Sequence, residues 1–221
     1  MAGNTVLDRS AIARRGRRLE YFTIAWNAVE GLVAIISGAI AGSISLVGFG
    51  IDSFIEVASG GALLWRMTVD ADTRRRERNE RRALALVGLC FAALAVYIAH
   101  GSITDLWQQR APAPSIPGIV LACVSLVVMP LLSRAKRRVG RALDSAAMHA
   151  DAQQTEFCAY LSAILIGGLV LNAWFGLWWA DPLSALLMVP IIARAAWDAL
   201  LGTSCRRCSP ATPHRTSDSA P

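Results

Sequence analysis

The sequence predicts an all-α integral membrane protein, a bundle of six transmembrane helices with the N- and C-termini in the cytoplasm. Of its 221 residues, 54% are hydrophobic and only 17% are charged, and the charged residues occur in clusters. The mean hydropathy of the chain is +0.43. Six apolar stretches are long enough to cross a bilayer, because about 20 helical residues span roughly 30 Å of hydrocarbon. Helices are expected because they satisfy their own backbone polar groups in lipid.

The expected helices follow one another with short connections. They cover residues 21–41, 43–66, 83–104, 117–133, 157–177 and 182–200. Ala41-Gly42-Ser43 leaves room only for a tight turn between the first two spans, and the proline-rich segment 110–117 separates the third from the fourth. Asp181 followed by Pro182 indicates the N-cap and the first residue of the sixth helix.

Basic residues lie on alternate connections and predict the orientation. One cluster lies in the N-terminal arm, one after the second span, one after the fourth and one in the tail, whereas the intervening connections carry only Arg110. The third cluster consists of Arg134, Lys136, Arg137, Arg138 and Arg141. The positive-inside rule places all four clusters in the cytoplasm, so we expect a multi-pass protein of the cell (inner or plasma) membrane. Topology thus explains the net charge of +6, and no nucleic-acid partner is expected.

The chain divides into three parts. We expect a basic cytoplasmic arm over residues 1–20, a transmembrane domain over 21–204 and a short cytoplasmic tail over 205–221. The tail is rich in proline, serine and threonine, which predicts disorder. Its Cys205 and Cys208 form a C-x-x-C pair, which cannot close a tetrahedral zinc site alone. This pair either captures a soft metal or is incidental.

Two acids, Asp52 and Glu56, lie inside the second apolar stretch. Their spacing of four residues places them on one face of a helix, and Asp52 falls near the middle of the membrane. A carboxylate at that depth costs about 2.5 kcal/mol or more, so intramembrane acids usually mark a functional site. The alternative is that one acid pairs with a polar group on another helix and only fixes the packing.

The fifth span carries a stripe of polar residues. These are Asp151, Gln154, Thr155, Cys158 and Ser162, which recur at helical spacing. Carboxylates, an amide oxygen and a thiolate from two facing helices could together enclose a divalent metal ion. We therefore take Asp52, Glu56, Asp151, Gln154 and Cys158 as candidate metal ligands. Alternatively, Asp151 and Gln154 are interfacial and Cys158 is a small core residue.

The first span adds Thr23, Asn27 and Glu30 on one face. Glu30 also falls near mid-membrane, where it could carry protons or act as an entry ligand. It could equally pair with a polar group on another helix. Asn27 and Glu30 are therefore candidate pathway residues whose role the sequence leaves open.

These residues carry a family resemblance. The segment 42–56, with two acids four residues apart, is similar to the metal-binding second-helix motif of the cation diffusion facilitators, a family of heavy-metal cation transporters. In that family the fifth helix has an Ala-Asp start followed by a His-x-x-x-Asp pair. When the Ala-Asp start of the family's helix is aligned with Ala150 and Asp151, the histidine position matches Gln154 and the aspartate position matches Cys158. The start of the sixth helix, residues 180–186, also resembles the family.

Two departures from the family pattern matter. Gln154 and Cys158 replace the usual histidine and aspartate of the fifth helix, which bears on the metal and on the site geometry. Only some twenty residues follow the sixth span, so we expect a short form without the family's cytoplasmic C-terminal domain.

We expect a secondary transporter of a divalent heavy-metal cation. Oxygen and sulfur ligands together favour zinc, cadmium, cobalt or ferrous iron over magnesium. Such ligands must lose protons to bind metal, so metal and protons compete for them. Efflux by proton antiport is implied by the resemblance. The expected partners are the metal cation, protons and the lipid bilayer, with a second copy of the chain as a further candidate, and no cofactor is expected.

The sequence also leaves two other classes of protein to consider. A non-transporting helix bundle would use the buried acids for assembly or for binding a partner. An enzyme is not expected, because the chain has only three histidines and shows no serine–histidine or histidine-rich constellation.

Overall fold

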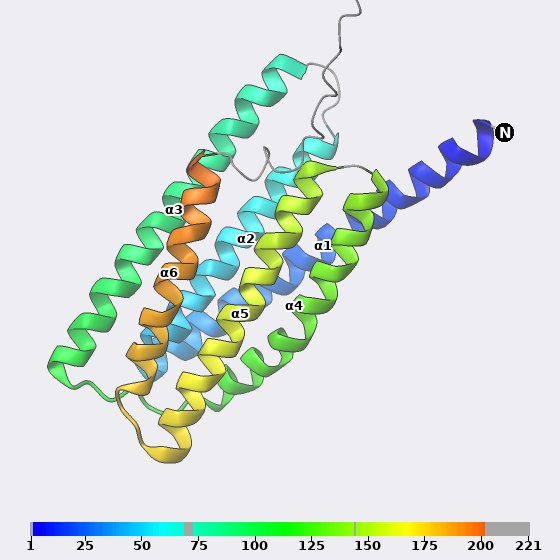
Figure 1. The fold of residues 1–221 in the computed structure, drawn as a ribbon. Helices are drawn as coiled ribbons and strands as arrows, with labels where there is room; N and C mark the ends of the chain where they lie inside the picture. The colour runs from blue at the N-terminus through cyan, green and yellow to red at the C-terminus, as the bar shows by residue number, and fades with distance from the viewer. Residues whose placement is uncertain (1, 69–72, 144, 202–221) are drawn as a thin grey trace, which may run out of the picture.

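The computed structural model describes residues 2–68, 73–143 and 145–201, and six long helices account for most of them (Figure 1). The helices are α1 (Ala2–Ala41), α2 (Ile44–Thr68), α3 (Thr73–Gln108), α4 (Ile116–Leu143), α5 (Ala146–Phe175) and α6 (Ala180–Leu201). Each contains a stretch long and apolar enough to cross a membrane. The predicted all-helical multi-pass architecture is therefore confirmed. The tail with Cys205 and Cys208 lies outside the described residues.

The helices extend well beyond the apolar stretches at one end of the bundle. The basic arm belongs to α1, α3 already begins at Thr73, and α4 continues to Leu143. The prediction that residues 74–82 and 134–141 lie in loops was therefore wrong, because both segments are helical. Arginine, alanine and leucine are good helix formers, so nothing in these segments ends a helix once it has left the hydrocarbon region.

The six helices form a four-helix group with a pair packed beside it (Figure 1). In the group α1 packs on α2, α4 packs on α5, and contacts of α1 with α4 and of α2 with α5 close the arrangement. The α3 and α6 helices pack along one another and contact the group through α2 and α5. The polar faces of α1, α2 and α5 thereby meet inside the bundle.

The two ends of the bundle differ in composition. The α1–α2, α3–α4 and α5–α6 connections lie at one end, here called the outer end (Figure 1). The opposite end, here called the arginine-rich end, holds the basic ends of the helices and both ends of the described chain. Trp107, Trp174 and Trp179 are exposed at the outer end. This distribution is what an even number of spans and an interfacial tryptophan belt require.

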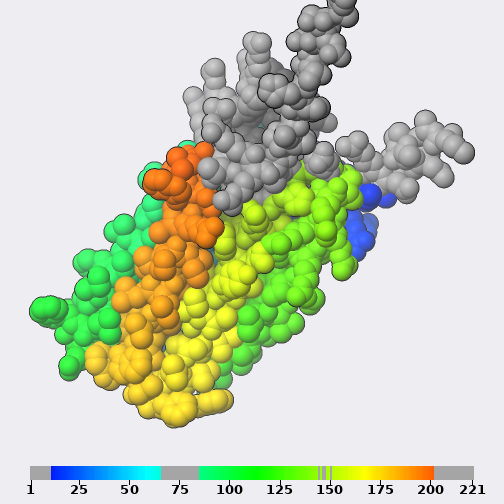
Figure 2. Space-filling view, in the orientation of Figure 1, coloured from blue at the N-terminus to red at the C-terminus, as the bar shows by residue number. Residues whose placement is uncertain are grey.

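Apolar side chains cover the lateral surface of the bundle, part of which is visible in Figure 2. Large exposed ones include Leu32 and Ile36 on α1, Val120 and Val127 on α4, and Leu187 on α6. In water such a surface would drive association, whereas in a bilayer it faces lipid tails.

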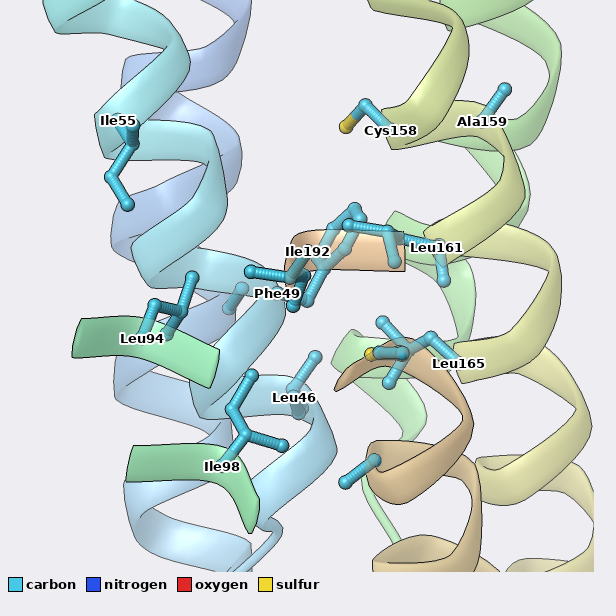
Figure 3. Packing of buried hydrophobic residues seen from close by; sticks show 14 of the residues in the cluster. Leu46, Phe49, Ile55, Leu94, Ile98, Cys158, Ala159, Leu161, Leu165 and Ile192 are labelled. Atoms are coloured by element: carbon cyan, nitrogen blue, oxygen red, sulfur yellow. The ribbon is translucent and has the colours of Figure 1, made fainter. Parts of the chain in front are cut away.

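Apolar side chains also fill the outer half of the interior (Figure 3). Leu46 and Phe49 of α2 meet Leu161 and Leu165 of α5, and Ile192 of α6 packs beside them. We call these five residues the outer apolar layer. On α2 and α5 this layer lies between Asp52 or Cys158 and the outer end, so it separates those residues from that end.

The α1–α2 connection is the predicted tight turn. Gly42 has φ 69°, a left-handed conformation that glycine adopts without a steric penalty. The Ser43 hydroxyl accepts a hydrogen bond from the Leu46 backbone N–H at 3.1 Å and so caps α2.

Asp181 does not cap its own helix as predicted. The α6 helix already begins at Ala180, and the buried Asp181 carboxylate faces the start of α2 instead. It accepts hydrogen bonds from the hydroxyls of Ser43, at 2.6 Å, and Ser45. A carboxylate is favoured there because a helix N-terminus carries partial positive charge. Asp181 thus links α2 to α6 at the outer end.

The α1 and α2 helices approach each other closely at Gly50. A methyl group at this position would lie 2.9 Å from the Ile35 backbone nitrogen, and a rigid neighbouring helix cannot easily move away. We expect Gly50→Ala to destabilise the protein by about 1–3 kcal/mol through overpacking. Thermal unfolding in detergent measures the effect.

Gly61→Ala, on the same helix, is the matched control. A methyl group on Gly61 would meet no described atom within 4 Å. Equal melting temperatures for the two variants would contradict the close packing of α1 on α2.

Candidate functional site

Asp52 and Glu56 lie one turn apart on α2 and both point into the bundle. Their residues are 7% and 2% exposed, respectively. Neither acid therefore faces the lipid, although both belong to a membrane-spanning helix. The two acids are four residues apart on α2, so their side chains lie on the same face of the helix.

Glu30 of α1 belongs to the same interior. It is fully buried, and its Oε2 accepts a hydrogen bond from the Ser53 hydroxyl of α2 at 3.0 Å. The Sγ atom of Cys158, on α5, lies 4.0 Å from the same oxygen. The sequence left the role of Glu30 open, and the structure brings its carboxyl group next to Ser53 of α2 and Cys158 of α5.

Cys158 is buried beside all three carboxylates. Glu30, Glu56 and Asp52 each lie close enough to interact electrostatically with its thiol. Cys90 and Cys123, by contrast, are exposed on α3 and α4. We call Glu30, Asp52, Glu56 and Cys158 the acid site, to which α1, α2 and α5 all contribute.

Gln154 and Asp151 lie apart from the acid site. They precede Cys158 on α5 by one and two helical turns, toward the arginine-rich end. The Gln154 Oε1 atom accepts a hydrogen bond from the Ser59 hydroxyl of α2 at 3.0 Å. Asp151 forms an ion pair with Lys136. The candidate ligands of the fifth span therefore do not all converge on Asp52 and Glu56.

Three buried oxygens in or next to the acid site lack hydrogen-bond donors among the described residues. They are Oε1 of Glu30, Oε2 of Glu56 and Oδ1 of Asn27, a residue buried on α1. A buried acceptor without a donor costs about 1–3 kcal/mol, and a bound cation would remove that cost. In the part of the chain that the structure describes, no three His, Cys, Asp or Glu side chains are arranged to hold a metal ion together.

The prediction that Lys136 lies in a loop after the fourth span was wrong, because it is part of α4 and fully buried. The α4 helix continues past the apolar stretch 117–133, and residue 136 lies on the face of the helix that points into the bundle. Met129 and Ala122, seven and fourteen residues earlier, are buried on the same face. A spacing of seven residues is two helical turns, so this signal was present in the sequence.

Glu20 was assigned to the basic arm, yet it is also fully buried, as part of α1. Its Oε2 lies 3.2 Å from the Lys136 Nζ atom, which also donates to Thr155 Oγ1 at 3.3 Å. The Thr155 hydroxyl in turn donates to Glu56 Oε1 at 2.7 Å. We call Glu20, Lys136 and Asp151 the lysine cluster. Thr155 connects it to the acid site.

Six apolar helices around buried carboxylates and a thiol define a multi-pass membrane protein with a polar interior. The family model of the cation efflux transmembrane domain matches residues 21–203. The chain therefore belongs to the cation efflux family, which confirms the resemblance noted in the sequence.

Three curated relatives also match. The uncharacterized transporter MJ0449 of Methanocaldococcus jannaschii is 26% identical over 185 residues, which are 81% of this chain and 65% of the relative. The uncharacterized transporter sll1263 of Synechocystis is 25% identical over 67% of this chain and 50% of its own length. The magnetosome protein MamB of Paramagnetospirillum magneticum is 26% identical over 76% of this chain and 58% of its own length. The chain thus spans about half to two thirds of these relatives.

Proposed function

We propose that the protein is a secondary transporter that moves a divalent heavy-metal cation across the membrane in exchange for protons. The observation that carries this proposal is the acid site, three carboxylates and a thiol buried in a membrane-spanning bundle. Acids in such a position are costly unless a cation or a proton neutralises them. Membership of the cation efflux family and two relatives named as transporters support the same function.

The chemistry of the acid site would couple the movement of metal to the movement of protons. Carboxylates and a thiolate bind metal only after losing their protons, so metal and protons exclude one another. A site that alternately faces the two sides of the membrane then releases metal where protons are abundant. We propose efflux from the cytoplasm on this basis, with protons flowing inward.

The ligand set determines the class of metal. Cys158 offers sulfur, while Glu30, Asp52 and Glu56 offer oxygen. Thiolate ligands favour zinc, cadmium, cobalt or ferrous iron, whereas magnesium prefers oxygen and retains its water. We propose these four residues as direct ligands. Asp151, Gln154 and Asn27 then line the approach.

Both ends of this pathway are closed. The outer apolar layer covers the acid site toward the outer end, and the lysine cluster lies toward the arginine-rich end. Transport requires the outer apolar layer and the lysine cluster to open one after the other. The burial of all four acid-site residues supports interpreting this conformation as an occluded state of the proposed transporter.

The test is metal uptake by the purified protein in proteoliposomes. We expect zinc or cadmium to move across the membrane when a pH gradient is imposed, toward the more acidic compartment. A protonophore that dissipates the gradient should stop uphill accumulation. Apparent metal affinity should fall as the pH on the loading side falls, because protons occupy the ligands.

A panel of metals in the same assay separates this function from its rival. The ion-paired lysine cluster would also suit a helix bundle whose buried charges serve only assembly. A correctly folded protein that moves none of the metals, with or without a pH gradient, supports that alternative.

A further inference from the structure

Lys136 places a positive charge where the acid site meets the arginine-rich end, and we propose that it gates this end of the pathway. Its ammonium group acts as a tethered cation that a metal ion must displace to reach the acid site. This inference rests on the proposed transport function and goes beyond it. Lys136 is a positioning residue in this role, since it contacts no described acid-site residue directly.

The geometry of the lysine cluster supports a gate. The fully buried Nζ atom of Lys136, on α4, contacts Glu20 of α1 and both Asp151 and Thr155 of α5. One ammonium group therefore holds three helices together in the interior. When it moves, α1, α4 and α5 lose a shared contact at the arginine-rich end.

The ionisable groups of the cluster do not match one for one. It contains two carboxyl groups, from Glu20 and Asp151, and one amine, from Lys136. In addition, Glu20 Oε1 and Asp151 Oδ1 are buried without a hydrogen-bond donor among the described residues. The pair of acids could therefore accept a dication in place of the lysine, since a dication would neutralise both charges.

The cluster lies between the acid site and one end of the bundle. Glu20 precedes Glu30 by ten residues on α1, which is about 15 Å along a helix. Asp151 precedes Cys158 by two turns on α5, in the same direction. Thr155 completes the connection, because it contacts Lys136 and donates to Glu56. A cation that moves from the arginine-rich end along the polar faces of α1 and α5 reaches this cluster first.

A lysine is suited to this task. Its ammonium group is a compact charge on a flexible four-carbon stem, so it can leave and return without moving the backbone. While no metal is present, it neutralises carboxylates that would otherwise repel one another. When metal arrives, repulsion between the two cations displaces the ammonium group. The lysine thus lowers the affinity for metal and prevents the cluster from trapping it.

The experiment compares Lys136→Met with the wild type. Without the ammonium group, Glu20 and Asp151 form an unopposed pair of acids, so the variant should bind one additional zinc or cadmium ion per chain by titration calorimetry in detergent. In proteoliposomes, the apparent KM should fall about tenfold or more and the turnover should fall by a similar factor. Lys136→Gln, which keeps a hydrogen-bond donor, makes the same test if the methionine variant does not fold.

Two control variants separate a gate from a purely structural role. Lys136→Arg keeps the charge and should retain the wild-type binding stoichiometry. Arg137→Gln removes a neighbouring charge that pairs with Glu156 on the surface, and it should leave KM unchanged. A folded neutral variant with lower thermal stability but unchanged KM and unchanged stoichiometry overturns the gate.

The two proposals can fail separately. If the wild type transports metal and the neutral variants do not alter KM or binding, the gate is wrong and the transport function stands. If no protein transports metal but the neutral variants gain a bound ion, the function is wrong and the competition between lysine and metal stands.

Discussion

Replacing Asp52 by asparagine is expected to abolish metal transport driven by a pH gradient. The amide has nearly the same shape as the carboxyl group, so folding should be preserved, while one negative charge and one proton-exchanging group are lost. Removing a carboxylate from a dication in a poorly solvated interior should reduce transport by about 100-fold or more. Initial rates of zinc or cadmium uptake by proteoliposomes measure this effect.

Glu156→Gln is the matched control for this experiment. It also removes a carboxylate from a membrane-spanning helix, but Glu156 is 37% exposed and pairs with Arg137 away from the interior. Its transport rate should stay close to that of the wild type. Full activity of Asp52→Asn would exclude Asp52 as a ligand, and equal loss in both variants would point to a general effect of charge.

Replacing Cys158 by serine is expected to change which metal the protein prefers. The substitution keeps the size and replaces a soft sulfur ligand by a hard oxygen ligand. Affinity for cadmium and zinc should fall about 10–100-fold, while affinity for manganese should change little. Competition between metals in the uptake assay measures the change in preference directly.

The other cysteines of the membrane spans provide the controls. Cys90 and Cys123 are exposed on the lateral surface, so Cys90→Ser and Cys123→Ser should leave the metal preference unchanged. If Cys158→Ser also keeps the wild-type preference, the thiol is a packing residue, as small buried cysteines often are.

Hydropathy and helical periodicity were sufficient to predict the six spans and the inward-facing acid pair. Both are strongly constrained by the solvent, because hydrocarbon excludes unpaired backbone groups and unpaired charges. The tight turn at Gly42 followed from the lack of space between two spans.

The lysine cluster was missed for a physical reason. The positive-inside rule counts lysine and arginine without regard to the helix face on which they lie, so Lys136 was grouped with the surrounding arginines. Its burial depends on α4 continuing as a helix past the apolar stretch. Once that helix is extended, the seven-residue spacing from Met129 places Lys136 inside the bundle.

The positions of Asp151 and Gln154 show a second limit. Periodicity correctly placed both on the polar face of α5, but it does not specify which residue on another helix each one meets. Asp151 meets Lys136 of α4, and Gln154 meets Ser59 of α2, because the neighbouring helices bring those groups to the same depth. Which side chains lie at the same depth in the bundle depends on how the helices pack against each other. The sequence of a single helix does not specify that packing.

The link from Asp181 to Ser43 and Ser45 has a mechanical consequence. These hydrogen bonds hold the outer ends of α2 and α6 together. If the helices tilt relative to each other, their outer ends therefore stay in place and their opposite ends move most. The α2 helix has 25 residues. Because each residue rises about 1.5 Å, a tilt of about 10° moves the far end of such a helix by about 6 Å. If the proposed transport is correct, we therefore expect helix tilting to widen the arginine-rich end and side-chain rotation to open the outer end.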